Sequence, residues 1–161
     1  MLPPIVFRHI RADDKGRLAT ALARLSPESQ HKRFLMPKPR FSSSELRYLT
    51  EIDGFDHVAI GAVSAEDPDV FYGVARFVRW QHDPEAAEAA IVVADPLQGM
   101  GLGRELGRRL ADEARERGVK RFTATLLGEN VAAHRLFASI SDRLEARYDG
   151  GLEELVADLA A

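Results

Sequence analysis

The stretch Ile91–Arg117, which reads IVVADPLQGMGLGRELGRRLADEARER, decides how the rest of the chain is interpreted. It opens with four apolar residues, a run typical of a buried strand, and Asp95-Pro96 then indicates a turn. Gly99, Gly101 and Gly103 follow, and a long helical pattern begins. Glycines let the backbone approach a ligand closely, and the free N–H groups of a helix start attract an anion. We therefore expect this stretch to bind a phosphorylated cofactor.

Length and composition limit the classes of protein to which this chain can belong. A chain of 161 residues, 45% hydrophobic and 29% charged, is typical of one globular α/β domain, here taken as residues 1–161. The net charge of −3 gives no sign of a nucleic-acid partner. The chain has no apolar run long enough for a membrane span, and its first ten residues do not resemble a signal peptide. We expect a cytoplasmic protein with neither membrane nor nucleic acid as a partner.

Cysteine is absent from the sequence. This absence excludes disulfides, thiolate metal sites and a covalent cysteine intermediate. The five histidines show no spacing that would place two of them on one metal ion, so no metal site is expected.

Periodicity, turn residues and helix caps predict a mixed order of strands and helices. We predict strands over residues 5–10, 57–64, 70–80, 86–94, 121–127, 143–148 and 152–159, and helices over 13–25, 27–34, 42–51, 102–117 and 130–140. The segment 152–159 also fits a short helix. Pro37-Lys38-Pro39 is expected to break the second helix, and Gly118 to end the fourth. The strand over 86–94, apolar except for Glu88, is expected to be covered on both faces.

The glycine-rich stretch does not match two common phosphate-binding motifs. A P-loop needs Lys-Ser or Lys-Thr after its glycines, and a dinucleotide fingerprint needs a third glycine where this chain has Arg104 or Leu106. The pattern present is Q-x-x-G-x-G, at Gln98, Gly101 and Gly103. Between a strand and a helix, this pattern resembles the acetyl-CoA motif of the GCN5-related N-acetyltransferase (GNAT) superfamily.

A second match lies one strand later, where Asn130, Ala133, Leu136 and Phe137 follow the family's N-x-x-A-x-x-L-[YF] pattern. The chain looks closest to the catalytic domain of bacterial Pat-type protein lysine acetyltransferases. That resemblance is carried by the segments SPES and RF at 26–34, HVA at 57–59, GVAR at 73–76 and AEAA at 87–90.

The resemblance implies a GNAT fold, a mixed and mostly antiparallel sheet of about seven strands with helices on both faces. It implies acetyl-CoA as co-substrate, with the pantetheine arm along the fourth strand and the pyrophosphate on the glycine-rich N–H groups. A backbone N–H near Val93 is the expected oxyanion donor. The cofactor-binding residues that it implies are Ile91, Val92, Val93, Gln98, Gly99, Met100, Gly101, Leu102, Gly103, Arg104, Asn130 and Phe137.

Glu88 is the candidate general base, because a carboxylate in an apolar strand is costly unless it is paired or used. We expect burial to make it a stronger base; the alternative is a salt-bridged glutamate at a strand end. Many GNAT enzymes have a tyrosine where this chain has Phe137, and phenylalanine cannot donate a proton. The thiolate would then leave unaided, with Tyr72 and Tyr148 as substitute acids.

The activity that the resemblance implies is acetyl transfer to a primary amine by direct attack in a ternary complex. A protein lysine is the leading acceptor, and members of the family are often homodimers. Two alternatives stay open. One is a small-molecule amine acetyltransferase, and the other is a weakly catalytic acyl-CoA-binding sensor module.

Overall fold

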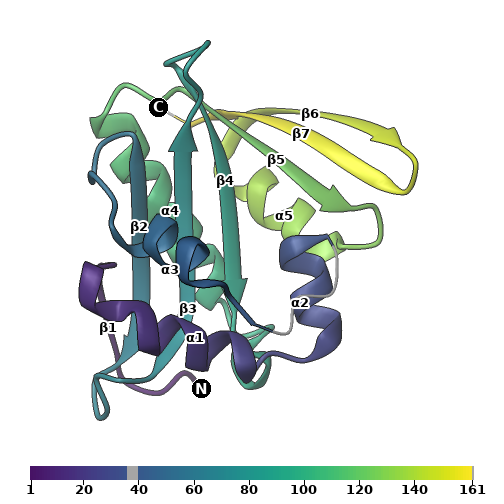
Figure 1. Cartoon of the computed structure of the whole chain (residues 1–161). Helices are drawn as coiled ribbons and strands as arrows, with labels where there is room; N and C mark the ends of the chain where they lie inside the picture. The colour runs from purple at the N-terminus through teal and green to yellow at the C-terminus, as the bar shows by residue number, and fades with distance from the viewer. Residues whose placement is uncertain (36–39, 161) are drawn as a thin grey trace.

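A computed structural model describes residues 1–35 and 40–160. One seven-stranded sheet runs through it in the order β1-β2-β3-β4-β5-β7-β6 (Figure 1). The strands are β1 Ile5–His9, β2 His57–Ser64, β3 Phe71–Arg79, β4 Ala86–Val93, β5 Arg121–Leu127, β6 Ser141–Asp149 and β7 Leu152–Leu159. All neighbouring pairs are antiparallel except β4 and β5. The predicted mixed, mostly antiparallel sheet is confirmed.

Helices cover both faces of the sheet (Figure 1). They are α1 Lys15–Ala23, α2 Pro27–Phe34, α3 Ser43–Thr50, α4 Leu102–Glu116 and α5 Val131–Ser139. One core cluster joins the sheet to α4 and α5, and a second joins it to α1 and α3. No helix in the described ranges combines the length and apolarity that crossing a membrane requires.

The longest helix shows how the sequence pattern produces the packing. Leu102, Leu106, Leu110 and Ala114 recur at helical spacing on α4, and all are at most 1% exposed. This apolar stripe lies against β2, β3 and β4. Gly118 follows the helix with φ +80°, a conformation that glycine adopts without strain.

The N-terminal helix differs from its prediction. Residues 13–25 were expected to form one helix, but a short 3-10 turn spans Ala12–Asp14 and α1 ends at Ala23. The Asp14 carboxylate explains the interruption, because it accepts hydrogen bonds from Arg8 at 2.8 and 2.9 Å and from the Arg11 N–H at 2.7 Å. Side-chain contacts between β1 and this turn therefore set the boundary. The expected break at Pro37-Lys38-Pro39 lies outside the described residues.

Candidate active site

The site begins where β4 and β5 separate. They pair only at Ala86–Arg121, Ala87–Phe122 and Glu88–Thr123, and then diverge (Figure 1). β4 stays paired with β3 as far as Val93, so its other edge has no partner strand among the described residues beyond Glu88. In the fourth strand, therefore, Ala86, Ala87 and Ala89 are buried, Glu88 is exposed, and residues 90–93 are half-buried. The expectation that it is covered throughout is wrong for this second half.

Backbone hydrogen bonds show which groups of β4 face the gap. The Ala86 carbonyl accepts from Trp80, and the Ala94 N–H donates to Tyr72, so both residues point toward β3. Successive residues of a strand direct their backbone groups to alternate edges. Ile91 and Val93 therefore present their backbone groups to the gap. An extended ligand arm can bind there by strand-like pairing.

The loop after β4 supplies a nest of N–H groups. Gly99 and Gly101 have φ values of +78° and +89°, which turn the chain into the start of α4. The backbone N–H groups of residues 99–104 donate no hydrogen bond to any acceptor in the part of the chain that the structure describes. Because the positive end of the α4 dipole lies at the same place, the loop fits an anionic group such as a pyrophosphate.

A cavity of about 650 Å³ connects the gap to this loop. Its lining contains all the predicted cofactor-binding residues except Met100 and Leu102. Leu102 is 1% exposed and belongs to the core cluster. At Gly103 a Cβ atom would lie 3.1 Å from Leu136, which explains why a glycine lets α4 approach α5 closely here.

The Gln98 side chain is held within the protein. Its amide donates to the Val93 carbonyl at 3.0 Å and to the Ser29 hydroxyl at 3.1 Å. The Asp95 carboxylate accepts from the Ser26 N–H at 2.7 Å and also from the Ser29 hydroxyl. Burial raises the pKa of Asp95, but the hydrogen bonds from Ser29 and Ser26 outweigh it and hold that pKa below its usual range. The Q-x-x-G-x-G glutamine thus braces α2 against the end of β4.

This brace could not be found from the sequence motif. Ser26 caps α2, since its hydroxyl accepts from the Ser29 N–H at 3.1 Å. Its second partner, Asp95, lies 69 positions away along the chain. Only the packing of α2 across the mouth of the gap brings the two together.

The helix after β5 places two further predicted residues. Asn130 caps α5, because its side-chain oxygen accepts from the Ala133 N–H at 3.3 Å, and it also lines the cavity. Phe137 is 3% exposed and lines the same cavity. Among the described lining residues none is a tyrosine. Tyr72 lines a different cavity, and Tyr148 is 64% exposed on the β6–β7 hairpin.

Glu88 stands at the apex of the gap, at the last paired position of β4 and β5. Its side chain is exposed, so the expectation that burial would strengthen this base is wrong. It forms no ion pair within residues 1–35 and 40–160, which removes the salt-bridge alternative there. Burial lowers the pKa of Arg33, and the Glu88 charge offsets part of this effect. The Arg33 guanidinium on α2 therefore interacts electrostatically with the candidate base, Glu88.

Comparison with known proteins agrees with this geometry. The model of the acetyltransferase (GNAT) family matches residues 25–140. Acetyltransferase Pat of Mycolicibacterium smegmatis is 35% identical over 148 residues, which cover 87% of this chain and 40% of Pat. Acetyltransferase PA5475 of Pseudomonas aeruginosa is 30% identical over 137 residues, covering 84% of this chain and 73% of that protein.

Comparison of the fold with solved structures also points to the GNAT family. The crystal structure of the GNAT domain of S. lividans PAT matches 96% of this chain and 90% of its own, with a TM-score of 0.86 and 30% identity. The present chain thus spans less than half the length of the mycobacterial Pat relative. The splayed strands, the glycine-rich N–H nest and these matches together show that the chain belongs to the GNAT family of acetyltransferases.

Proposed function

We propose that the protein transfers an acetyl group from acetyl-CoA to the primary amine of a protein lysine. One observation carries the proposal. The exposed Glu88 carboxylate stands at the apex of a gap that leads to a nest of free N–H groups. A donor held along that gap brings its thioester close to the open side of the sheet, where a lysine on another protein can enter.

Different residues of the chain bind the two parts of acetyl-CoA. The nest at residues 99–104 holds the pyrophosphate, and the Ile91 and Val93 backbone groups hold the pantetheine arm. Acetyl-CoA supplies the activated acyl carbon. A gap-facing N–H of β4, near Val93, is the donor for the developing oxyanion.

Glu88 removes a proton from the attacking ammonium, through a water molecule, because an exposed carboxylate at this place is open to solvent. Direct attack in a ternary complex follows, since the sequence has no cysteine to carry the acyl group. Phe137 has no proton to give, so protonation at sulfur comes from solvent.

The charges around the site bear on the acceptor. Among the described residues, no Asp or Glu lines either of the two cavities, whereas Arg33, Arg104 and Arg135 do. A polyamine acetyltransferase needs carboxylates to hold its polycationic substrate. The cavities therefore do not favour a polyamine, whereas a single lysine needs only access to Glu88.

Release of free CoA thiol tests the acceptor class. The protein is supplied with acetyl-CoA and, in separate reactions, with lysine-bearing proteins, spermidine and free amino acids. We expect thiol release with lysine-bearing proteins, together with N-acetyl lysine in their mass spectra. Faster release with spermidine than with any protein would refute the proposed acceptor.

A further inference from the structure

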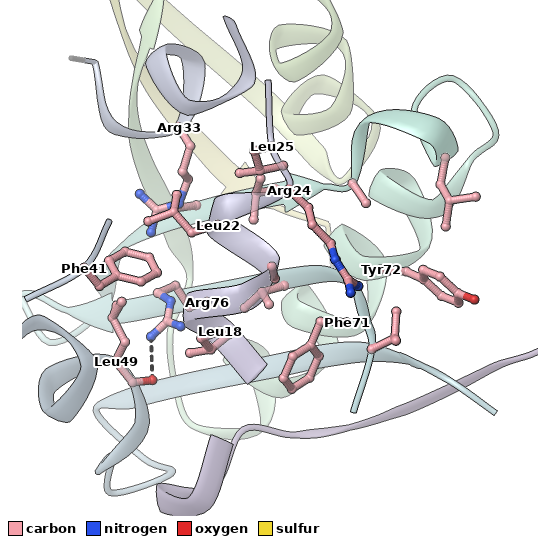
Figure 2. Close-up of a pocket in the computed structure, with 18 of the residues that line it drawn as sticks. Leu18, Leu22, Arg24, Leu25, Arg33, Phe41, Leu49, Phe71, Tyr72 and Arg76 are labelled. Atoms are coloured by element: carbon pink, nitrogen blue, oxygen red, sulfur yellow. Dashed lines mark hydrogen bonds between the residues drawn. The ribbon is translucent and has the colours of Figure 1, made fainter. Parts of the chain in front are cut away.

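A second cavity, of about 330 Å³, lies against the face of β3 and β4 that α1, α2 and α3 cover (Figure 2). Its walls are mainly aliphatic and aromatic, with Leu18, Leu22, Phe41 and Phe71 among them. It adjoins the cofactor cavity, because Arg33, Ala90, Val92 and Leu97 line both. A group attached to a thioester beside Ala90–Val92 can therefore extend into it.

Three arginines, Arg24, Arg33 and Arg76, line this apolar space, and none of them forms an ion pair with a described carboxylate. Arg76 on β3 is 6% exposed, and its Nη1 donates to the Leu49 carbonyl at 3.0 Å and to His57 Nε2 at 2.9 Å. The Arg33 side chain on α2 makes no hydrogen bond or ion pair with any other described residue; it lies over the Phe34 ring at 4.7 Å, and the Glu88 charge acts on it from farther away. Figure 2 shows the Arg33 and Arg76 side chains toward the end of the cavity that holds Phe41 and Leu49, with Arg24 toward the other end.

The free nitrogens of Arg76 are open to this space. Nε and Nη2 of Arg76 have no hydrogen-bond partner among the described residues. Every fully buried side-chain nitrogen there has a partner, so these two atoms are not fully buried. These two atoms are therefore reachable from the cavity. Burial and then the charge of Arg33 lower the pKa of Arg76 to about 9, so the two cations are close enough to repel each other. An anion between them would relieve both the repulsion and the missing hydrogen bonds.

The position of Glu88 decides which reactant brings that anion. Glu88 is exposed and is not among the residues that line either cavity. Alternation along β4 places Glu88 on the same sheet face as Ala90 and Val92, so an amine that gives its proton to Glu88 approaches beside this cavity and not through it. The cavity beside Ala90 and Val92 is left for the acyl group. Its volume of 330 Å³ far exceeds a methyl group, which is comparable to a water molecule at about 30 Å³.

We propose that this cavity binds the tail of a dicarboxylic acyl-CoA, such as succinyl- or glutaryl-CoA, with the terminal carboxylate between Arg33 and Arg76. The amine nitrogen bonds to the thioester carbon and the carbon–sulfur bond breaks. The amine proton goes to Glu88 and then to solvent, and CoA leaves as the thiolate, which solvent protonates. The product is an N-acylated lysine that carries a free carboxylate.

The test compares donors that differ at one end. Acetyl-, butyryl-, succinyl- and glutaryl-CoA are assayed with one lysine peptide, and their Kd values are measured by calorimetry without the peptide. Butyryl-CoA matches the chain length of succinyl-CoA but lacks the carboxylate. We expect succinyl- or glutaryl-CoA to exceed butyryl-CoA about tenfold in both affinity and kcat/KM, because a charged pair is lost with the neutral tail.

The variants Arg33→Gln and Arg76→Gln should bring the succinyl-to-butyryl ratio close to one. Arg24→Gln is the matched control, because Arg24 is an exposed arginine toward the other end of the same cavity, and it should leave the ratio unchanged. Arg33→Gln is the safer of the first two, since Arg76 also holds Leu49 and His57.

Equal Kd values for succinyl- and butyryl-CoA would overturn this inference. So would a carboxylate-bearing amine whose acetylation depends on Arg33, because the anion would then come from the acceptor. The inference rests on the proposed function, and different experimental results would contradict each of them. Acetyl transfer to the peptide without a preference for succinyl-CoA removes only the inference. Failure of acetyl transfer removes the proposed function, and the calorimetry still decides the carboxylate site.

Discussion

The buried His57–Arg76 contact predicts a loss of stability in weak acid. His57 is 8% exposed, and its Nε2 accepts a hydrogen bond from Arg76 Nη1 at 2.9 Å. Burial, and secondly the Arg76 charge, lower the pKa of His57 from 6.5 to about 4, against a smaller opposite effect of Asp53. A histidine in this setting stays neutral in the folded protein.

The sign and size follow from proton linkage. Between pH 6.5 and 4 the unfolded chain binds a proton at His57 and the folded chain does not, so the free energy of unfolding falls as the pH falls. The full stabilisation is present above pH 6.5. At about 1.4 kcal/mol per pKa unit, the loss between pH 7 and pH 4 is about 3 kcal/mol.

Urea denaturation of the wild type and of His57→Gln measures this loss. Glutamine does not titrate, and its side-chain oxygen can still accept from Arg76. Both proteins share the carboxylates that also respond to acid, so the difference between them isolates His57. We expect the wild type to lose about 3 kcal/mol more than the variant between pH 7 and pH 4. Parallel pH profiles would refute the assignment of a neutral, buried His57.

Three further changes test other parts of the structure. Asp14→Asn should lower the free energy of unfolding by about 3 kcal/mol in urea, because the fully buried Asp14 carboxylate is the ion-pair partner of the half-buried Arg8 and also binds Arg17, whereas Asp13→Asn should change it little. Gly101→Ala should cost about 1–2 kcal/mol in the same assay and weaken CoA binding in calorimetry, because its φ is +89°; Gly16→Ala, in helix α1, should do neither. Asp95→Asn should raise the KM for acetyl-CoA, because α2 loses its tie to the end of β4; an unchanged KM would contradict that role.

Much of the fold could be predicted because local and long-range signals agree. Helix α2, β2 and β5 occupy their predicted residues, 27–34, 57–64 and 121–127. The segment at 152–159, which also fitted a helix, is a strand. Its alternating buried and exposed residues pair with β5 and β6, and this sheet pairing settles the ambiguity.

The site was predicted less completely, for a physical reason. A run of apolar residues around Glu88 predicts a covered strand, but the divergence of β5 leaves the second half of β4 half-buried and Glu88 exposed. The sequence motif marks Gln98 without indicating that its amide binds Val93 and Ser29. Arg76 fits the alternation of its strand, and only the packed structure shows that its guanidinium enters an apolar cavity.

The central claim is that Glu88 accepts the amine proton during acetyl transfer. Its most direct test is the rate of acetylation of a lysine peptide by Glu88→Gln, with the acetyl-CoA Kd measured on the same sample. Glu85→Gln is the matched control, since Glu85 is a nearby exposed carboxylate that pairs with Lys120 at 2.9 Å. We predict a fall in kcat of about a hundredfold or more for Glu88→Gln, with unchanged acetyl-CoA affinity and a normal rate for Glu85→Gln. Equal rates for Glu88→Gln and the wild type would contradict the role of Glu88, and absence of transfer in both would favour an acyl-CoA-binding module over an enzyme.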